Sequence, residues 1–151
     1  MQTFLPSQDF AECARVLDNR RLNKQITECK QIVATIFGGS SGWENHPAIT
    51  MWRGYPLTLA GYGQSCYQEW MRRFDAGDRG GKREHKAGEW LREYPAITPL
   101  RLPKWFTPDV CSSYRALLLS KDPEWYGRFG WSEEPNADSK RIFEMIKEMS
   151  R

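Results

Sequence analysis

Apolar residues recur every three or four positions along several stretches of the chain, which is the spacing of helices with one buried face. The clearest case is residues 20–37, where the stripe consists of Leu22, Ile26, Cys29, Val33 and Ile36. Strict alternation of apolar and polar residues, which is typical of strands, is almost absent. The pattern therefore predicts an all-α fold, a compact helical bundle with long loops.

Residues that favour helix ends divide the chain into six predicted helices. Ser7 is a candidate N-cap after Pro6, Gly38-Gly39 ends the second helix, and Pro108 suits the first turn of a later one. The predicted helices cover residues 7–17, 20–37, 56–74, 82–93, 107–122 and 137–149, and the fourth has the weakest pattern. Composition predicts a loop at 40–47 and an extended connector at 95–103.

Composition narrows the class of protein. The 151 residues are 40% hydrophobic and 27% charged, which suits one folded domain spanning residues 1–151. No apolar run approaches the roughly 18 residues of a membrane span, and the first residues lack the features of a secretion signal. We therefore expect an intracellular, cytoplasmic monomer with no membrane partner.

Residues that carry metal or hydrolytic chemistry do not occur in recognisable patterns. The chain has no P-loop, no Gly-x-Ser-x-Gly and no His-Glu-x-x-His motif, and only two histidines, His46 and His85. No two cysteines form a Cys-x-x-Cys pair, so we expect buried, reduced thiols. The four cysteines are Cys13, Cys29, Cys66 and Cys111. We expect no metal and no cofactor.

The net charge is only +3, but the positive charge is unevenly placed. Residues 72–101 contain eight Lys/Arg and five Asp/Glu, whereas the rest of the chain is balanced. A basic segment that also contains glycines favours a polyanionic partner, and a solvated loop is the alternative.

A second feature lies on the polar side of the helix predicted for residues 20–37. A line beside the apolar stripe is formed by Arg21, Lys24, Glu28, Gln31 and Thr35, which recur at three- or four-residue spacing. One carboxylate therefore stands among cations and an amide. Taken alone, the line also fits ordinary Arg/Lys–Glu pairs on the surface of a helix.

Five short stretches share an order and spacing with a known family. They are Leu17-Asp18 with Leu22; Glu28; the Gly42-Trp43-x-Asn45-His46-Pro47 loop; residues 62–74; and residues 122–130 with Pro123, Trp125 and Tyr126. This arrangement resembles the pyrimidine-dimer DNA glycosylase family, whose founding type is phage endonuclease V. The resemblance covers most of residues 3–131, and it depends on the order of the motifs rather than on any single one.

The resemblance implies an all-α enzyme that binds damaged duplex DNA and attacks it with an N-terminal α-amine. The amine would attack C1′ of the damaged nucleotide, expel the base and form a Schiff base, after which β-elimination nicks the strand. Because α-amino groups ordinarily have a pKa of about 7.7–8.0, much of such an amine is neutral near pH 7. Glu28 aligns with the family's carboxylate, which stabilises the cationic sugar and shuttles protons.

Some positions depart from the family pattern. Thr27 stands where the family has an Arg, and Gln31 stands where it has a second cation. We expect Arg21 and Lys24 to replace that charge. Because the second residue, Gln2, is bulky, Met1 is expected to be retained. The nucleophile is then the Met1 α-amine or, alternatively, Lys24, and a glycosylase that uses water is a further alternative.

We expect Arg and Lys side chains to bind DNA phosphates, and aromatic rings to fill the gap left by an extruded nucleotide. The predicted DNA contacts are Arg20, Arg21, Lys24, His46, Arg53, Arg72, Arg73, Lys82, Arg83 and Lys86. The predicted base-flipping or stacking residues are Trp43, Trp52, Trp125 and Tyr126, with core packing as the alternative for Trp52 and Trp125.

These inferences predict a DNA glycosylase that acts on a damaged or modified pyrimidine in duplex DNA, with a coupled abasic-site lyase step. One alternative is a DNA- or lesion-binding module without catalysis, acting in repair or phage defence. Another is a protein-interaction domain, which would show no salt-sensitive DNA binding.

Overall fold

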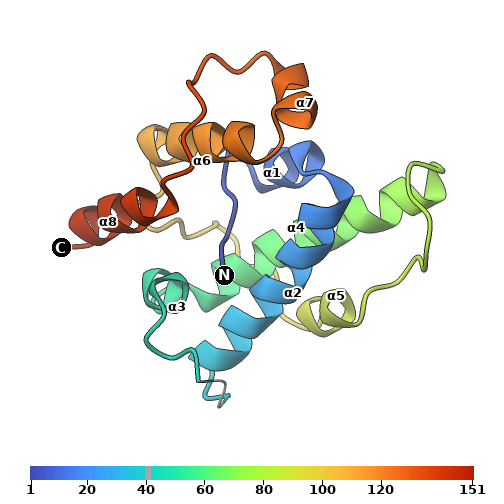
Figure 1. Cartoon of the computed structure of the whole chain (residues 1–151). Coiled ribbons are helices and arrows are strands. Elements are labelled where there is room, and N and C mark those ends of the chain that lie inside the picture. The colour runs from blue at the N-terminus through green and yellow to red at the C-terminus, as the bar shows by residue number, and fades with distance from the viewer. Residues whose placement is uncertain (40–41) are drawn as a thin grey trace.

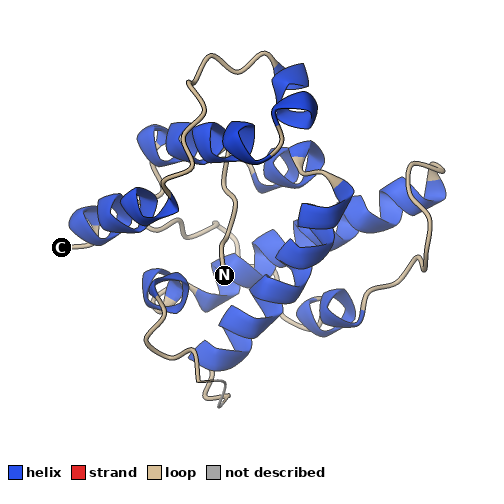
Figure 2. Ribbon diagram, in the orientation of Figure 1, coloured by secondary structure: helices blue, strands red, loops and turns tan. Residues whose placement is uncertain are grey.

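The computed structural model describes residues 1–39 and 42–151, and within these ranges it contains helices joined by loops and no strand (Figures 1 and 2). The elements are α1 (Phe10–Val16), α2 (Asn19–Ile36), α3 (Pro47–Trp52), α4 (Pro56–Asp75), α5 (Lys86–Leu91), α6 (Pro108–Lys121), α7 (Pro123–Tyr126), the 3-10 turn η1 (Gly127–Phe129) and α8 (Ser139–Met149). The all-α class predicted from the apolar spacing is confirmed.

The two long helices α2 and α4 pack along each other at the centre of the fold. Helix α1 packs on α4, and α5 covers both α2 and α4. Helix α6 packs with α7 and α8, while α3 lies against both α2 and α8 and so joins the two groups. Buried apolar residues from Phe4 to Ile146 form one hydrophobic core, whose burial stabilises the fold by roughly 25 cal/mol per Å² of apolar surface.

Two glycines allow α5 to approach the central helices. A Cβ added at Gly63 of α4 would lie 2.6 Å from a methyl carbon of Leu91. A Cβ added at Gly88 of α5 would lie 2.4 Å from the ring of Tyr67. Because neither position has room for a side chain, both glycines permit close helix packing.

Helix α1 begins later than predicted. Its N-cap is Asp9, whose carboxylate accepts a hydrogen bond from the Ala11 N–H at 3.0 Å. The Ser7 hydroxyl instead accepts from the Asp9 N–H at 3.1 Å. Ser7 therefore supports the residue that caps the helix, and the predicted start at residue 7 is wrong.

Histidines begin two short helices. The Nδ1 atom of His46 accepts from the Ala48 N–H at 3.0 Å, and the same atom of His85 accepts from the Ala87 N–H at 3.1 Å. His46 thereby starts α3, which the sequence did not predict, and His85 starts α5, which is shorter than the predicted helix 82–93. Asp122 has two roles. It ends α6, as predicted, and its carboxylate caps α7, a helix that was not predicted.

The structure also shows the state of the cysteines and what the described residues contain at other positions. All four cysteines are buried and free, as expected. Of the predicted loop 40–47, Ser40 and Ser41 lie outside the described residues. No helix in the described ranges is long and apolar enough to span a membrane. Within the same ranges, no group of three His, Cys, Asp or Glu side chains is arranged to hold a metal ion.

Candidate active site

The N-terminal segment enters the core as an extended chain. Thr3, Phe4 and Leu5 are buried, and in Figure 1 the segment runs from α1 to a position beside α2. The Trp52 indole donates a hydrogen bond to the Thr3 hydroxyl at 3.1 Å. The Tyr62 hydroxyl donates to the Phe4 carbonyl. Side chains of α3 and α4 therefore fix the segment from two sides.

Side chains of α2 hold the same segment. The Gln25 amide donates to the Gln2 carbonyl at 2.9 Å and accepts from the Phe4 N–H at 2.6 Å. One turn further along the helix, Glu28 Oε2 accepts from the Gln2 N–H at 3.2 Å. These bonds place the Glu28 carboxylate beside the peptide that follows Met1, close to the N-terminal amine.

The Glu28 side chain is only 8% exposed, although its helix position looked polar from the sequence. The N-terminal segment covers that part of α2 and excludes water from it. Burial raises the pKa of Glu28 above its ordinary value of 4.5, because desolvation disfavours the charged form. The Gln2 N–H, the positive N-terminal amine and Lys24 act in the opposite direction. Glu28 is therefore a carboxylate whose ionisation depends on the groups around Met1.

A surface pocket opens over this carboxylate, with a volume of about 280 Å³. It is lined by Met1, Gln2, Phe4, Arg20, Arg21, Lys24, Glu28 and Lys121. Lys24 Nζ lies 3.9 Å from Glu28 Oε1, and its side chain is 71% exposed. The pocket thus combines an amine and a buried carboxylate with four cationic side chains, a composition suited to holding an anion next to a reacting group.

His46 and Trp43, from the predicted loop motif, do not line this pocket. Because His46 Nδ1 accepts the Ala48 N–H, the neutral ring carries its hydrogen on Nε2. Burial lowers the pKa of His46, and the charge of the N-terminal amine lowers it further. The Trp43 ring contacts the His46 ring edge-on at 5.7 Å and is 47% exposed. Within the predicted loop motif, the pKa of His46 therefore responds to the N-terminal charge, and Trp43 packs on His46.

Asp18 connects the start of α2 to the C-terminal half of the chain. Its carboxylate accepts hydrogen bonds from the Tyr126 hydroxyl and from Arg21 Nη1, the latter at 3.1 Å. Burial would raise the pKa of Asp18, but the bonds from Tyr126 and Arg21 outweigh it, and the pKa is lowered. Asp18 therefore stays charged, and it orients Arg21 at the pocket.

Three predicted site residues are buried, which corrects their assigned roles. Trp52 is fully buried and hydrogen-bonded to Thr3, and Tyr126 is fully buried against Asp18. Arg73 is 5% exposed, and its guanidinium is 2.7 Å from Glu69 Oε2. None of the three presents a free surface for stacking on a base or contacting a phosphate.

Trp125 has a structural role as well. Its indole N–H donates to the Val16 carbonyl at 2.8 Å, and the Arg128 guanidinium covers its ring at 3.8 Å. Core packing, the alternative foreseen from the sequence, fits Trp125 and Trp52 better than stacking on DNA.

Several predicted phosphate contacts have protein partners instead. Arg72 pairs with Glu69 at 2.8 Å, Arg83 pairs with Asp75 at 2.8 Å, and Arg53 donates to the Glu44 carbonyl at 2.7 Å. These three, together with Lys82 and Lys86, lie outside the set of described residues that line the pocket. The basic excess of residues 72–101 is therefore partly neutralised within the fold, whereas Arg20, Arg21 and Lys24 meet at the pocket.

Neither Lys121 nor Gln25 was predicted from the sequence to take part in this site. Lys121 is an exposed residue at the end of α6 that lines the pocket, although it lies far from α2 along the chain. Gln25 is fully buried and holds the N-terminal segment. Lys121 gave no local signal, whereas Gln25 could have been noticed as a polar residue directly beside Ile26 in the apolar stripe.

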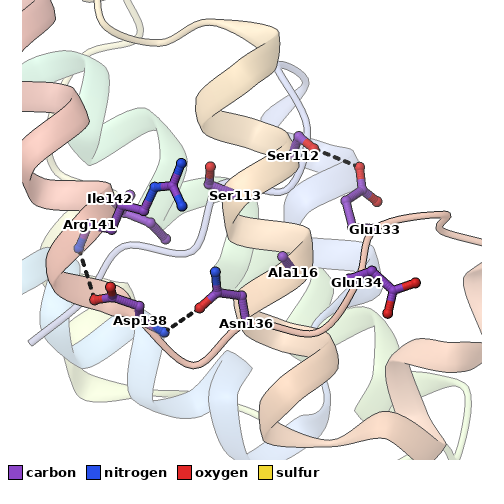
Figure 3. A pocket seen from close by; sticks show the side chains of 9 residues that line it. All are labelled: Ser112, Ser113, Ala116, Glu133, Glu134, Asn136, Asp138, Arg141 and Ile142. Carbon is purple, nitrogen blue, oxygen red and sulfur yellow. Dashed lines mark hydrogen bonds between the residues drawn. The ribbon is translucent and has the colours of Figure 1, made fainter.

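A second polar pocket lies between α6, α8 and the 131–138 loop (Figure 3). There Glu133 accepts from Ser112 at 2.8 Å and pairs with Arg115 at 2.8 Å. The Asp138 carboxylate accepts from the Arg141 N–H at 3.2 Å and so caps α8. These carboxylates already hold the loop in place, which gives this pocket a structural explanation.

Comparison with known proteins agrees with the geometry. The sequence model of the pyrimidine dimer DNA glycosylase family matches residues 1–79, which include Met1, Gln25 and Glu28. The chain belongs to this family, and at the family level it is a pyrimidine dimer DNA glycosylase, whose substrate is DNA. No curated protein and no solved structure matches the chain.

Proposed function

We propose that this chain removes a damaged pyrimidine from duplex DNA through the Met1 α-amine and then nicks the strand at the resulting site. The observation that supports this most directly is the hydrogen bond from the Gln2 N–H to the buried Glu28 carboxylate. It puts a carboxylate next to the N-terminal amine, inside a pocket that also contains four cationic side chains. Family membership supports the same chemistry.

The proposed first step is attack of the neutral amine on C1′ of the damaged nucleotide. The new N–C1′ bond forms while the glycosidic bond breaks, and the base leaves with the bonding electron pair and is protonated. Glu28, when ionised, stabilises the positive charge that develops on the sugar. Its burial strengthens this interaction, because charges attract more strongly where water is excluded.

The proposed second step converts the sugar into a Schiff base and cleaves the strand. Loss of the amine proton and opening of the sugar ring give a protonated imine at C1′. Removal of a proton from C2′ then expels the 3′ phosphate by β-elimination. Glu28 is the carboxylate in the pocket that can exchange these protons.

The cations of the pocket support binding of the flanking DNA backbone. Arg20, Lys24 and Lys121 are exposed side chains around the opening, and Arg21 is held there by Asp18. Such contacts fix the position of the backbone without reading sequence. Trp43 is exposed on the loop that carries His46, and it is the ring we propose to fill the space left by an extruded base.

Borohydride trapping tests this proposal. The purified protein is incubated with UV-irradiated duplex and with abasic-site duplex, and the adduct is mapped by peptide mass. We expect a covalent adduct at residue 1, and an adduct at the same residue in the Lys24→Ala variant. An adduct at Lys24 would contradict the assignment of the nucleophile. Base release without an adduct would indicate a glycosylase that uses water, and DNA binding with neither would indicate a lesion-binding module.

A further inference from the structure

The N-terminal segment is held by an unusually placed amide. Gln25 is fully buried on α2, one turn before Glu28, and its side chain spans two peptide groups of the segment. Its oxygen accepts from the Phe4 N–H, and its nitrogen donates to the Gln2 carbonyl. One glutamine side chain carries both an accepting oxygen and a donating NH2 group, so Gln25 alone can serve both peptide groups.

The bonds to residues 2–4 form a continuous series. Glu28 accepts a hydrogen bond from the Gln2 N–H. Gln25 donates to the Gln2 carbonyl and accepts from the Phe4 N–H. Tyr62 donates to the Phe4 carbonyl. The Tyr62 hydroxyl also lies 3.3 Å from Gln25 Oε1. The N–H and carbonyl groups of Gln2 and Phe4 thereby all have partners, and Met1 is the first residue beyond these attachments.

We propose that Gln25 is a positioning residue for the nucleophile: its amide fixes residues 2–4 so that the Met1 amine remains within reach of C1′ and Glu28. This inference rests on the proposed function, because it assigns a role relative to the amine. Gln25 itself does not touch the substrate, since it is buried and does not line the pocket. Gln25 acts on the position of the Met1 amine. A displacement of a reacting group by about 1 Å can lower a reaction rate about 100-fold.

The test is Gln25→Leu, which keeps the size of the side chain and removes both hydrogen-bonding groups. Borohydride trapping is followed under single-turnover conditions with saturating abasic-site duplex, so that the rate constant and the amplitude are obtained separately. We expect the rate constant for adduct formation to fall about 100-fold, while the amplitude and the DNA dissociation constant stay unchanged.

The amplitude separates positioning from a general loss of structure. A variant that is merely less stable has fewer active molecules, so its amplitude falls while its rate constant does not. Leu91→Ala is the matched control, because Leu91 is a fully buried residue packed against Gly63, in the part of the core between α4 and α5. We expect this control to lose thermal stability and to keep the wild-type rate constant.

Tyr62→Phe is the second variant and covers the case in which Gln25→Leu does not fold. It removes only the hydroxyl that binds the Phe4 carbonyl, and we expect a smaller fall in the same rate constant. Unchanged rate constants in these variants, or a loss confined to amplitude or to DNA affinity, would overturn the positioning role alone. Absence of any residue 1 adduct in the wild-type protein would overturn the proposed nucleophile and, with it, this inference.

Discussion

Glu28 and Glu133 each lie at a polar pocket, but their surroundings act on them in opposite ways. Glu28 is buried beneath the N-terminal segment, and burial raises its pKa. Glu133 accepts hydrogen bonds from Arg115 and Ser112, and the bond from Arg115 contributes most to lowering its pKa. Glu28 is held where burial disfavours its negative charge, whereas the negative charge of Glu133 is balanced by Arg115.

The difference separates a site that can react from one that holds the fold together. At the C-terminal pocket, Arg115 and Glu133 are already paired, and Arg115 also donates to the Pro6 carbonyl. At the N-terminal pocket, Arg20 and Lys121 take part in none of the ion pairs of the described residues. Carboxylates with a perturbed pKa that lie near cations without an ion-pair partner are typical of functional sites. A carboxylate that is already paired with an arginine is typical of structural ones.

The largest expected effect comes from exchanging each carboxylate for an amide. Glu28→Gln should slow base release by about 100- to 10,000-fold, because general acid–base groups contribute about that much. Affinity for lesion-containing duplex should be retained. The matched variant Glu133→Gln should release base at the wild-type rate. Equal losses in both variants would mean that the two pockets do not differ in function.

A second prediction concerns the amine. One glycine added before Met1 would move the amine along the chain by about 3.3–3.6 Å, while residues 2–4 keep their contacts. We expect borohydride trapping to slow about 100-fold, since the amine no longer lies in position for attack. The same glycine added after Arg151 should have no effect. Undiminished trapping by the N-terminally extended protein would point to Lys24 instead.

Much of the fold was predictable from local patterns. The stripe from Leu22 to Ile36 identified α2 because its apolar face packs continuously against α4, and the same spacing isolated Glu28. Short helices were missed because α3 and α7 have too few turns to display a period. His46, the cap of α3, lies in the segment 40–47 whose composition indicated a loop, and Asp122, the cap of α7, was predicted only to end the preceding helix.

Apart from Met1, which the family resemblance indicated, the candidate site was predictable only where it lies on one helix. Arg20, Arg21, Lys24 and Glu28 all belong to α2, so helical spacing could group them. Lys121 reaches the pocket through the packing of the C-terminal half, which no local pattern encodes. The burial of Trp52 and Tyr126 likewise depends on partners distant in sequence, Thr3 and Asp18.

A third prediction uses the opposite pKa shifts. Because the pKa of Glu133 is lowered in the folded protein, this residue stabilises the fold above pH 4.5. The contribution is lost as pH falls through the folded-state pKa. Glu133→Gln should therefore cost about 1.5–3 kcal/mol at neutral pH, the range for hydrogen bonds to charged groups, and little in acid. Urea unfolding at several pH values measures this difference.

Glu28 should show the reverse trend. Because its folded-state pKa is raised, the folded protein binds more protons than the unfolded chain between pH 4.5 and that raised value. Its contribution to stability therefore falls as pH rises through this window. Glu28→Gln should gain stability relative to the wild-type protein over the same interval. Parallel pH profiles for Glu28→Gln and Glu133→Gln would contradict the contrast between the two pockets.

The smallest expected effect distinguishes Lys121, which has no ion-pair partner among the described residues, from Arg83, which is paired with Asp75. Lys121→Ala should weaken binding to any duplex and reduce the slope of log affinity against log salt by about 0.9, the value for one lost phosphate contact. Arg83 is engaged with Asp75, so Arg83→Ala should leave that slope unchanged. Titrations from low to moderate salt measure both. If Arg83→Ala changes the slope and Lys121→Ala does not, the DNA backbone follows the basic segment 72–101 rather than the pocket over Glu28.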